Sequence, residues 1–249
     1  GKARYMAPEV VRNMTAPNVM TDRFSLAVVL FRLLFLDHPL EGKRVVEAPC
    51  LTEELELKFY GKDPVFMFDP GDDRNRPVRG VHANAICFWP MYPKFIQNKF
   101  IEALSKDAMT GNAPRMTDND WQIAFTRLRD TIITCPCGSE TFINVAGDAN
   151  CCGCGQKIPK PPVLNCHNHK YGLALFPGMK LYRCHIDKGS DNFTEVIGEV
   201  SRNPKNPGVW GLRNVSDVVW NVETQDGGIR PVEKGQVAPI AAIRAHPFS

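Results

Sequence analysis

Apolar residues recur at helical spacing through the first half of the chain. Thr21 and Asp22 predict a capped helix start, with Thr21 as the capping residue and Asp22 in the first turn. The apolar positions that follow lie three or four residues apart, at Phe24, Ala27, Val28 and Phe31. The pattern predicts an amphipathic helix that buries this face.

A second strong helix signal begins at Thr117, which forms a capping-box pair with Asp120. Its predicted buried face comprises Trp121, Phe125, Leu128 and Ile132. Between residues 40 and 93, proline and glycine are frequent and periodicity is weak, which predicts loops and short helices. Residues 1–133 are therefore predicted to be an all-α segment.

From residue 163 onward, short apolar runs alternate with turn residues. The strand candidates are residues 173–176, 180–185, 196–200, 218–222 and 229–232. Turns are predicted at Pro177-Gly178, Asn206-Pro207-Gly208 and Asp226-Gly227-Gly228. The pattern predicts a C-terminal all-β sandwich over residues 163–249.

Composition narrows the class of protein only slightly. Apolar residues make up 43% of the 249-residue chain, which is ordinary for a folded domain, and the net charge of +3 does not favour nucleic acid or an anionic membrane as partner. The longest apolar run, residues 26–36, is too short for a bilayer, which needs about 20 residues. No membrane partner is expected.

Nine cysteines are present, and five of them fall within twenty residues. An odd, clustered set favours metal ligation over a secreted disulfide framework, and so predicts a reducing, cytoplasmic compartment. Cys135-Pro136-Cys137-Gly138 and Cys151-Cys152-Gly153-Cys154-Gly155 resemble the two knuckles of a zinc ribbon over residues 134–162. The predicted ligands of a structural Zn²⁺ are Cys135, Cys137, Cys151 and Cys154.

The ligand set leaves alternatives open. The first knuckle is one residue shorter than the usual Cys-x-x-Cys, and Cys152 could replace Cys151. Cys166, His167 and His169 are further candidates outside the two knuckles. Four thiolates would leave no open coordination position, so the predicted metal supports folding and not chemistry.

Three motifs in the first segment occur in an order that points to one family. Gly1-Lys2-Ala3-Arg4-Tyr5-Met6-Ala7-Pro8-Glu9 ends in an Ala-Pro-Glu signature, Thr21-Asp22-Arg23-Phe24-Ser25 follows, and Arg115 precedes the last predicted helix. This half of the chain resembles the C-terminal lobe of a eukaryotic-type protein kinase, of bacterial or phage-like build, from the Ala-Pro-Glu motif onward.

The resemblance implies structural roles for three residues. Glu9 would form a buried ion pair with Arg115, for which Arg74 and Arg76 are rival partners. Asp22 would accept backbone hydrogen bonds from the catalytic loop, although a first-turn carboxylate favoured by the helix dipole is the plainer interpretation.

The resemblance also implies what the chain can do. Residues Lys2, Ala3, Arg4 and Tyr5 would belong to the substrate-binding loop, where Lys2 departs from the threonine of many serine/threonine kinases and leaves the preference for Ser/Thr or Tyr open. The family's residues for ATP, Mg²⁺ and catalysis precede Ala-Pro-Glu. The chain is thus expected to start inside the kinase domain and to be inactive alone, while a full-length parent would phosphorylate proteins.

The sequence leaves other functions open. Residues 208–216 give the β segment a distant resemblance to a forkhead-associated domain, but the Ser-x-x-His phosphate element is missing and Ser201-Arg202-Asn203 is its nearest substitute. A β-sandwich without a phosphate site is therefore favoured. A non-catalytic pseudokinase scaffold that binds signalling proteins is the main alternative to the kinase, and nucleic-acid binding through the ribbon is weaker.

Overall fold

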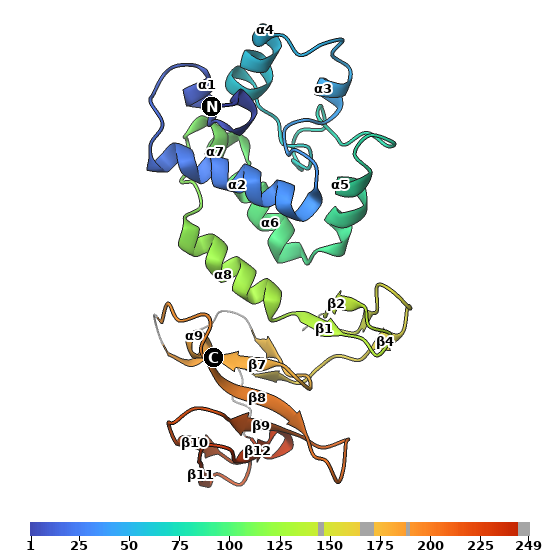
Figure 1. The fold of residues 1–249 in the computed structure, drawn as a ribbon, viewed down its shortest axis with the longest axis vertical. Helices are drawn as coiled ribbons and strands as arrows, with labels where there is room; N and C mark the ends of the chain where they lie inside the picture. The colour runs from blue at the N-terminus through green and yellow to red at the C-terminus, as the bar shows by residue number, and fades with distance from the viewer. Residues whose placement is uncertain (144–146, 165–171, 188–189, 244–249) are drawn as a thin grey trace. The chain divides into compact units, whose positions relative to one another are not determined.

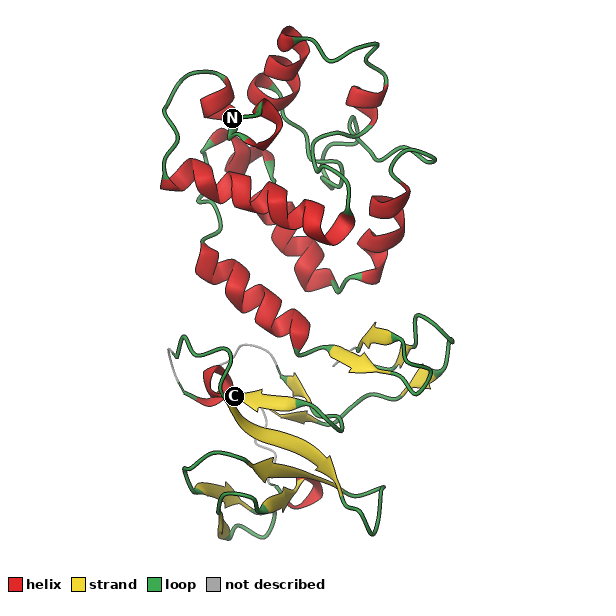
Figure 2. Cartoon of the chain, viewed as in Figure 1, coloured by secondary structure: helices red, strands yellow, loops and turns green. Residues whose placement is uncertain are grey.

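The computed structural model describes residues 1–143, 147–164, 172–187 and 190–243. The chain divides into two compact units, Gly1–Phe125 and Thr126–Ser249. Helices form the first unit and antiparallel strands dominate the second (Figure 1, Figure 2). The helical segment was predicted to end at residue 133, whereas the first unit ends at Phe125.

The first unit consists of short helices arranged around one long helix. Its α-helices are α1 (Pro8–Val11), α2 (Val19–Phe35), α3 (Lys43–Val46), α4 (Glu53–Glu56), α5 (Ala83–Phe88), α6 (Lys94–Ala103) and α7 (Lys106–Thr110). The other helical turns are η1 (Ala3–Tyr5), η2 (Leu57–Lys62) and η3 (Trp89–Met91). Short helices and loops between residues 40 and 93 match the prediction from weak periodicity.

The buried face of α2 forms the centre of the first unit. Phe24, Ala27, Val28 and Phe31, the predicted face, are all at most 1% exposed. The ring of Phe31 packs edge-on against Phe66 and Phe100, with centroids 5.4 and 5.5 Å apart. These aromatic contacts join α2 to α6 and to the loop before α5.

The start of α2 differs from the prediction. Asn18, and not Thr21, is the N-cap: its Oδ1 accepts hydrogen bonds from the N–H groups of Met20 and Thr21 at 2.9 and 3.2 Å. Thr21 completes the capping box by accepting from the N–H of Asn18. The assignment of Thr21 as capping residue was wrong because Val19 and Met20, which form the first turn, are exposed and carry no periodic signal.

The helix α8 (Asp118–Arg129) has the predicted capping box, since Thr117 and Asp120 exchange backbone and side-chain hydrogen bonds. Its C-terminal end was predicted wrongly. Ile132 lies in strand β1 (Ile132–Thr134) and pairs with Phe142. An apolar residue at helical spacing does not show where the backbone leaves the helix.

The described residues of the second unit form one four-stranded antiparallel sheet and four two-stranded ones. The larger sheet has the order β12-β9-β8-β7, with β7 (Lys180–Tyr182), β8 (Val196–Arg202), β9 (Trp210–Asn214) and β12 (Val237–Pro239). The smaller sheets pair β1 with β2 (Glu140–Phe142), β3 (Ala149–Asn150) with β4 (Lys157–Ile158), β5 (Val163–Leu164) with β6 (Leu173–Ala174), and β10 (Trp220–Glu223) with β11 (Ile229–Val232).

Each predicted strand is present at least in part, but residues 175–176 and 218–219 lie outside β6 and β10, and β5 and β12 were not predicted. Residues 183–185, predicted as strand, belong to a short helix α9 (Arg183–Ile186). Strand β9 was not predicted, because Gly211 and Asn214 interrupt its apolar pattern. It nevertheless lies inside the sheet, with Val200 opposite Leu212 in the register of β8 and β9.

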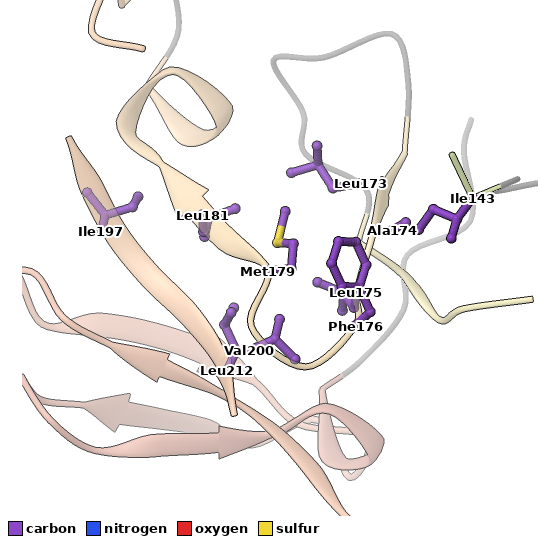
Figure 3. Packing of buried hydrophobic residues seen from close by; sticks show 10 residues of the cluster. All are labelled: Ile143, Leu173, Ala174, Leu175, Phe176, Met179, Leu181, Ile197, Val200 and Leu212. Atoms are coloured by element: carbon purple, nitrogen blue, oxygen red, sulfur yellow. The ribbon is translucent and has the colours of Figure 1, made fainter. Parts of the chain in front are cut away.

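Described residues of the second unit form a hydrophobic core (Figure 3). Its buried members come from β6, β7, β8 and β9, from the turn before β7, and from the segment after β2. Ile143 is the buried residue of that segment, and Ile133 and Ile158 from the cysteine-rich region pack against the same core. The predicted ribbon and the predicted β domain therefore share buried apolar surface.

Gly198 lies at a point of β8 where a side chain has no room. An added Cβ would lie 2.6 Å from the Trp220 ring and 3.3 Å from Leu181 Cβ. We expect Gly198→Ala to lower the free energy of unfolding by about 1–3 kcal/mol, because the indole must shift. Urea denaturation checks this against Gly208→Ala, whose Cβ would approach only Asn206, at 3.5 Å. Equal losses in both variants would contradict the packing argument.

None of the described helices is both long enough and apolar enough to cross a bilayer.

Candidate functional site

The first cysteine knuckle is the tight turn between β1 and β2. Cys135 donates its N–H to the carbonyl of Ser139 at 2.9 Å, and Gly138 donates to the carbonyl of Cys135 at 2.8 Å. Gly138 has a φ of +88°, a left-handed conformation that glycine adopts without a steric cost. The short Cys-x-Cys spacing thus still gives a closed turn that carries two thiols.

The second knuckle, between β3 and β4, repeats this hydrogen-bond pattern with one more residue in the turn. Cys151 donates to the carbonyl of Gln156 at 2.8 Å, and Gly155 donates to the carbonyl of Cys151 at 2.9 Å. Gly155 has a φ of +73°. Cys151 and Cys154 therefore occupy the positions that Cys135 and Cys137 hold in the first knuckle.

The two knuckles bring four sulfur atoms together. The Sγ atoms of Cys135, Cys137, Cys151 and Cys154 all lie within 4.8 Å of one another. Cys135 and Cys154 are 3.7 Å apart, and Cys137 and Cys151 are 3.6 Å apart. Tetrahedral zinc–sulfur bonds of about 2.3 Å place sulfurs about 3.8 Å apart. The cluster can hold one metal ion, and its geometry is compatible with a structural Zn²⁺.

Backbone N–H groups favour the thiolate form at Cys151. The N–H groups of Cys154 and Gly153 point at its sulfur from 3.5 and 3.4 Å. The hydrogen bond from Cys154, aided by the one from Gly153, lowers the pKa of the Cys151 thiol to about 6 although burial raises it. Zinc binds the thiolate, so the knuckle prepares this ligand.

Without a bound cation, the same environment opposes the simultaneous ionisation of all four thiols. The N–H of Cys137 lowers the pKa of Cys135, but burial and the neighbouring thiols raise it more, to about 12. Ser139, through its hydroxyl and its N–H, holds the pKa of Cys137 below its usual value. A divalent cation supplies the charge that lets all four sulfurs ionise together.

The structure separates Cys152 from the cluster. Its N–H donates to Thr141 Oγ1 at 3.1 Å, and its sulfur lies 3.0 Å from the carbonyl oxygen of Glu140. Cys151, and not Cys152, therefore belongs to the set of four. Cys166, His167 and His169 lie outside the described residues.

The ion pair that the resemblance implies in the first unit is present. Arg115 donates from both terminal nitrogens to the carboxylate of Glu9, at 2.7 and 2.9 Å. Its Nε donates to the carbonyl of Ala108 at 3.0 Å, and Nη1 also reaches the carbonyl of Met20 at 3.0 Å. The Arg115 side chain is only 5% exposed. One guanidinium thus ties the segment of Ala7, Pro8 and Glu9 to α2 and α7.

The rival partners of Glu9 are engaged elsewhere. Arg74 forms ion pairs with Asp63 and Asp72 at 3.0 and 2.6 Å. Arg76 reaches the carbonyl of Met67, at 3.4 Å.

Asp22 lies exposed in the first turn of α2 and makes no hydrogen bond through its side chain with any described residue. This position agrees with the plain first-turn carboxylate and leaves the side chain accessible to a further segment.

The loop of residues 2–5 is fixed at two carbonyl groups. Ser25 Oγ on α2 donates to the carbonyl of Tyr5 at 2.8 Å, and His38 Nε2 lies 2.8 Å from the carbonyl oxygen of Arg4. Because Leu40 donates its N–H to His38 Nδ1, Nε2 carries the ring proton and donates it to Arg4. Lys2 and Ala3 have no such anchor among the described residues.

Two side-chain contacts were missed from the sequence. Glu41 accepts from Arg4 and from the Tyr60 hydroxyl, the latter at 2.8 Å. In the second unit, His185 is fully buried and its Nε2 lies 2.8 Å from Asp130 Oδ2. His38, which precedes Pro39 and Leu40 and whose Nδ1 lies 3.7 Å from Glu41 Oε1, was the signal available for the first contact.

The residue singled out by the forkhead-associated resemblance lies on an aromatic side chain. The guanidinium carbon of Arg202 is 5.9 Å from the centroid of the Trp210 ring.

No protein-family model, curated protein or solved structure matches this chain.

Proposed function

We propose that the first unit is the C-lobe scaffold of a protein kinase whose full-length parent transfers the γ-phosphate of ATP to a protein hydroxyl, most readily Ser or Thr. The observation that carries the proposal is the bidentate ion pair of Glu9 and Arg115, 106 residues apart. It joins the Ala-Pro-Glu motif to the arginine before α8, in the arrangement that the resemblance implies.

In this proposal the anchored loop of residues 2–5 presents the protein substrate. Ser25 and His38 hold the backbone of Tyr5 and Arg4 against α2, so the loop is fixed before a substrate arrives. Exposed Asp22 accepts hydrogen bonds from the backbone of the parent's catalytic loop. The ATP- and Mg²⁺-binding residues belong to the parent's preceding segment.

The four-cysteine cluster has a structural role in this proposal. Four thiolates complete the tetrahedral coordination of Zn²⁺ and leave no position for a substrate or a water. Ile133 and Ile158, which lie in the strands next to the knuckles, pack against the core of the second unit. The zinc-bound unit then offers a rigid surface to protein partners in signalling.

The test compares this chain with a longer protein that carries the upstream segment. We expect the chain alone neither to bind ATP nor to phosphorylate a generic protein substrate, and the longer protein to do both in a radiolabelled phosphate-transfer assay. An upstream segment without the His-Arg-Asp and Asp-Phe-Gly motifs, or a longer protein with both motifs and no transfer, would refute the kinase and favour the pseudokinase scaffold.

A further inference from the structure

Two guanidinium groups lie against one aromatic ring in the first unit. The guanidinium carbons of Arg4, on η1, and Arg32, in the last turn of α2, are 5.8 and 5.4 Å from the centroid of the Tyr5 ring. Arg4 and Arg32 are both half-buried. Like charges gathered at one place repel each other unless anionic groups compensate them.

The compensation within the chain is incomplete. Arg4 forms an ion pair with Glu41, but that carboxylate is shared with the Tyr60 hydroxyl. Arg32 makes no hydrogen bond or ion pair through its side chain with any described residue, and the buried Nε atoms of both arginines lack an acceptor. A guanidinium offers five N–H donors, so Arg32 has capacity for an oxyanion that the described residues do not fill.

The neighbouring histidine does not supply the missing charge. Burial lowers the pKa of His38 to about 3, opposed by the hydrogen bond to the Arg4 carbonyl and aided by the positive charge of Arg4 and Arg32. His38 is therefore neutral near pH 7 and donates to a backbone carbonyl.

Apolar side chains continue from Arg32 along the outer side of α2. Val29, Leu33 and Leu36 are 51%, 69% and 57% exposed. Residues three apart are neighbours on a helix, so Val29 borders Arg32, while Leu36 is the C-cap that follows α2 with a φ of 59°. An exposed apolar stripe beside an unpaired arginine fits a peptide that carries both an acidic group and apolar side chains, and it fits a free anion less well.

We propose that Arg4 and Arg32 form a binding site for an oxyanion of a peptide segment, either an Asp or Glu carboxylate or a phosphoryl group, with Val29, Leu33 and Leu36 contacting its apolar side chains. Guanidinium groups bind both oxyanions through paired hydrogen bonds. This assignment rests on the proposed function, because it specifies the substrate class as acidic protein segments.

The test is peptide binding to the intact chain, measured by fluorescence anisotropy. Three labelled peptides share leucines at the same positions and carry glutamate, phosphoserine or glutamine between them. We expect the glutamate or the phosphoserine peptide to bind at least about tenfold more tightly than the glutamine peptide. Whichever acidic peptide binds better identifies the source of the oxyanion. Equal binding of all three peptides would overturn the proposal.

Variants on α2 separate the site from general positive charge. Arg32→Gln is expected to weaken binding of the acidic peptide about tenfold, whereas Arg23→Gln leaves it unchanged. Arg23 is a matched control because it lies on the same helix and its Nε also lacks an acceptor. Equal losses in the two variants, or tighter binding of a labelled oligonucleotide than of either acidic peptide, would overturn the site. Unchanged thermal melting of Arg32→Gln shows that the variant folds.

The binding assay needs no phosphate transfer, so the two proposals can fail separately. A chain that binds the acidic peptide while the longer protein transfers no phosphate leaves the site intact and refutes the kinase. A longer protein that phosphorylates glutamine and glutamate peptides equally well refutes the acidic preference alone.

Discussion

Cys151→Ala is expected to abolish metal binding and to unfold the region around both cysteine knuckles, whereas Cys152→Ala should leave both unchanged. The two cysteines are adjacent in sequence, but only Cys151 places its sulfur among the four. Cys152 contacts the carbonyl of Glu140 instead. The two variants therefore change the composition in the same way and differ only in whether the lost sulfur belongs to the cluster.

The expected loss is large because one metal ion would tie both knuckles together through all four sulfur atoms. Structural zinc sites of this kind contribute about 10–16 kcal/mol in small peptides at neutral pH. Without the metal, Ile133, Ile143 and Ile158 would lose the support that holds them on the core of the second unit.

Elemental analysis and thermal melting measure both effects. We expect about one zinc per chain in the unmodified protein and in Cys152→Ala, and none in Cys151→Ala, with the melting transition of the second unit lost on chelation. A metal-free protein that melts at the same temperature as the zinc-loaded one would contradict the structural role.

Glu9→Ala is expected to lower the free energy of unfolding of the first unit by about 2–4 kcal/mol. Removing one partner of a fully buried ion pair costs about 3–5 kcal/mol because the other charge is left unpaired. The Glu9 side chain is 23% exposed, so water can reach Arg115 in the variant and reduces the loss. Chemical denaturation measures the difference. Glu54→Ala is the control, since Glu54 is exposed and has no ion pair with a described residue.

The effect of Glu9 depends on pH in a definite direction. Burial raises the pKa of Glu9, but the hydrogen bonds and charge of Arg115 outweigh it and hold the pKa below its ordinary value of 4.5. A carboxyl with a lowered pKa stabilises the fold above its unfolded pKa and loses this contribution as pH falls through its folded pKa. The difference in the free energy of unfolding between the wild-type protein and Glu9→Ala should thus be largest above about pH 5.5 and become smaller in acid. A gap that grows on acidification would contradict the ion pair.

Periodicity predicted the elements that bury one regular face. The apolar spacing of α2 and α8 and the turns at Pro177-Gly178 and Asp226-Gly227-Gly228 were enough to place helices and strands. Boundaries were harder, because Ile132 keeps the helical spacing but pairs with Phe142 across β1 and β2. Local pattern gives the type of an element and not the residue at which the backbone changes direction.

Strand β9 shows what periodicity cannot detect. Gly211 is required there because a Cβ would lie 2.2 Å from Val237 Cγ1. Asn214 is fully buried, and its side-chain nitrogen donates to the carbonyls of Val218 and Val232 at 2.7 and 2.8 Å. Both residues weaken a strand signal, yet both serve contacts with segments distant in sequence.

The candidate sites were predictable to different degrees. Cysteine spacing predicted the four cysteines of the cluster but left Cys152 open as a replacement for Cys151, because that distinction depends on where each sulfur lies. The pairing of Glu9 with Arg115 came from ordered motifs. The unpaired state of Arg32 had no sequence signal at all, because it depends on which acidic side chains are absent from its neighbourhood in the described fold.

The separation of Glu9 and Arg115 has a consequence for synthesis on the ribosome. Chains grow from the N-terminus at about 5–20 residues per second, so 106 residues correspond to a delay of roughly 5–20 seconds. Throughout this interval the Ala-Pro-Glu segment has been made but lacks the guanidinium that anchors it. The Ala-Pro-Glu segment can therefore be anchored through Arg115 only after this delay, and nascent chains stalled before Arg115 should expose it to proteases and chaperones more than longer chains do.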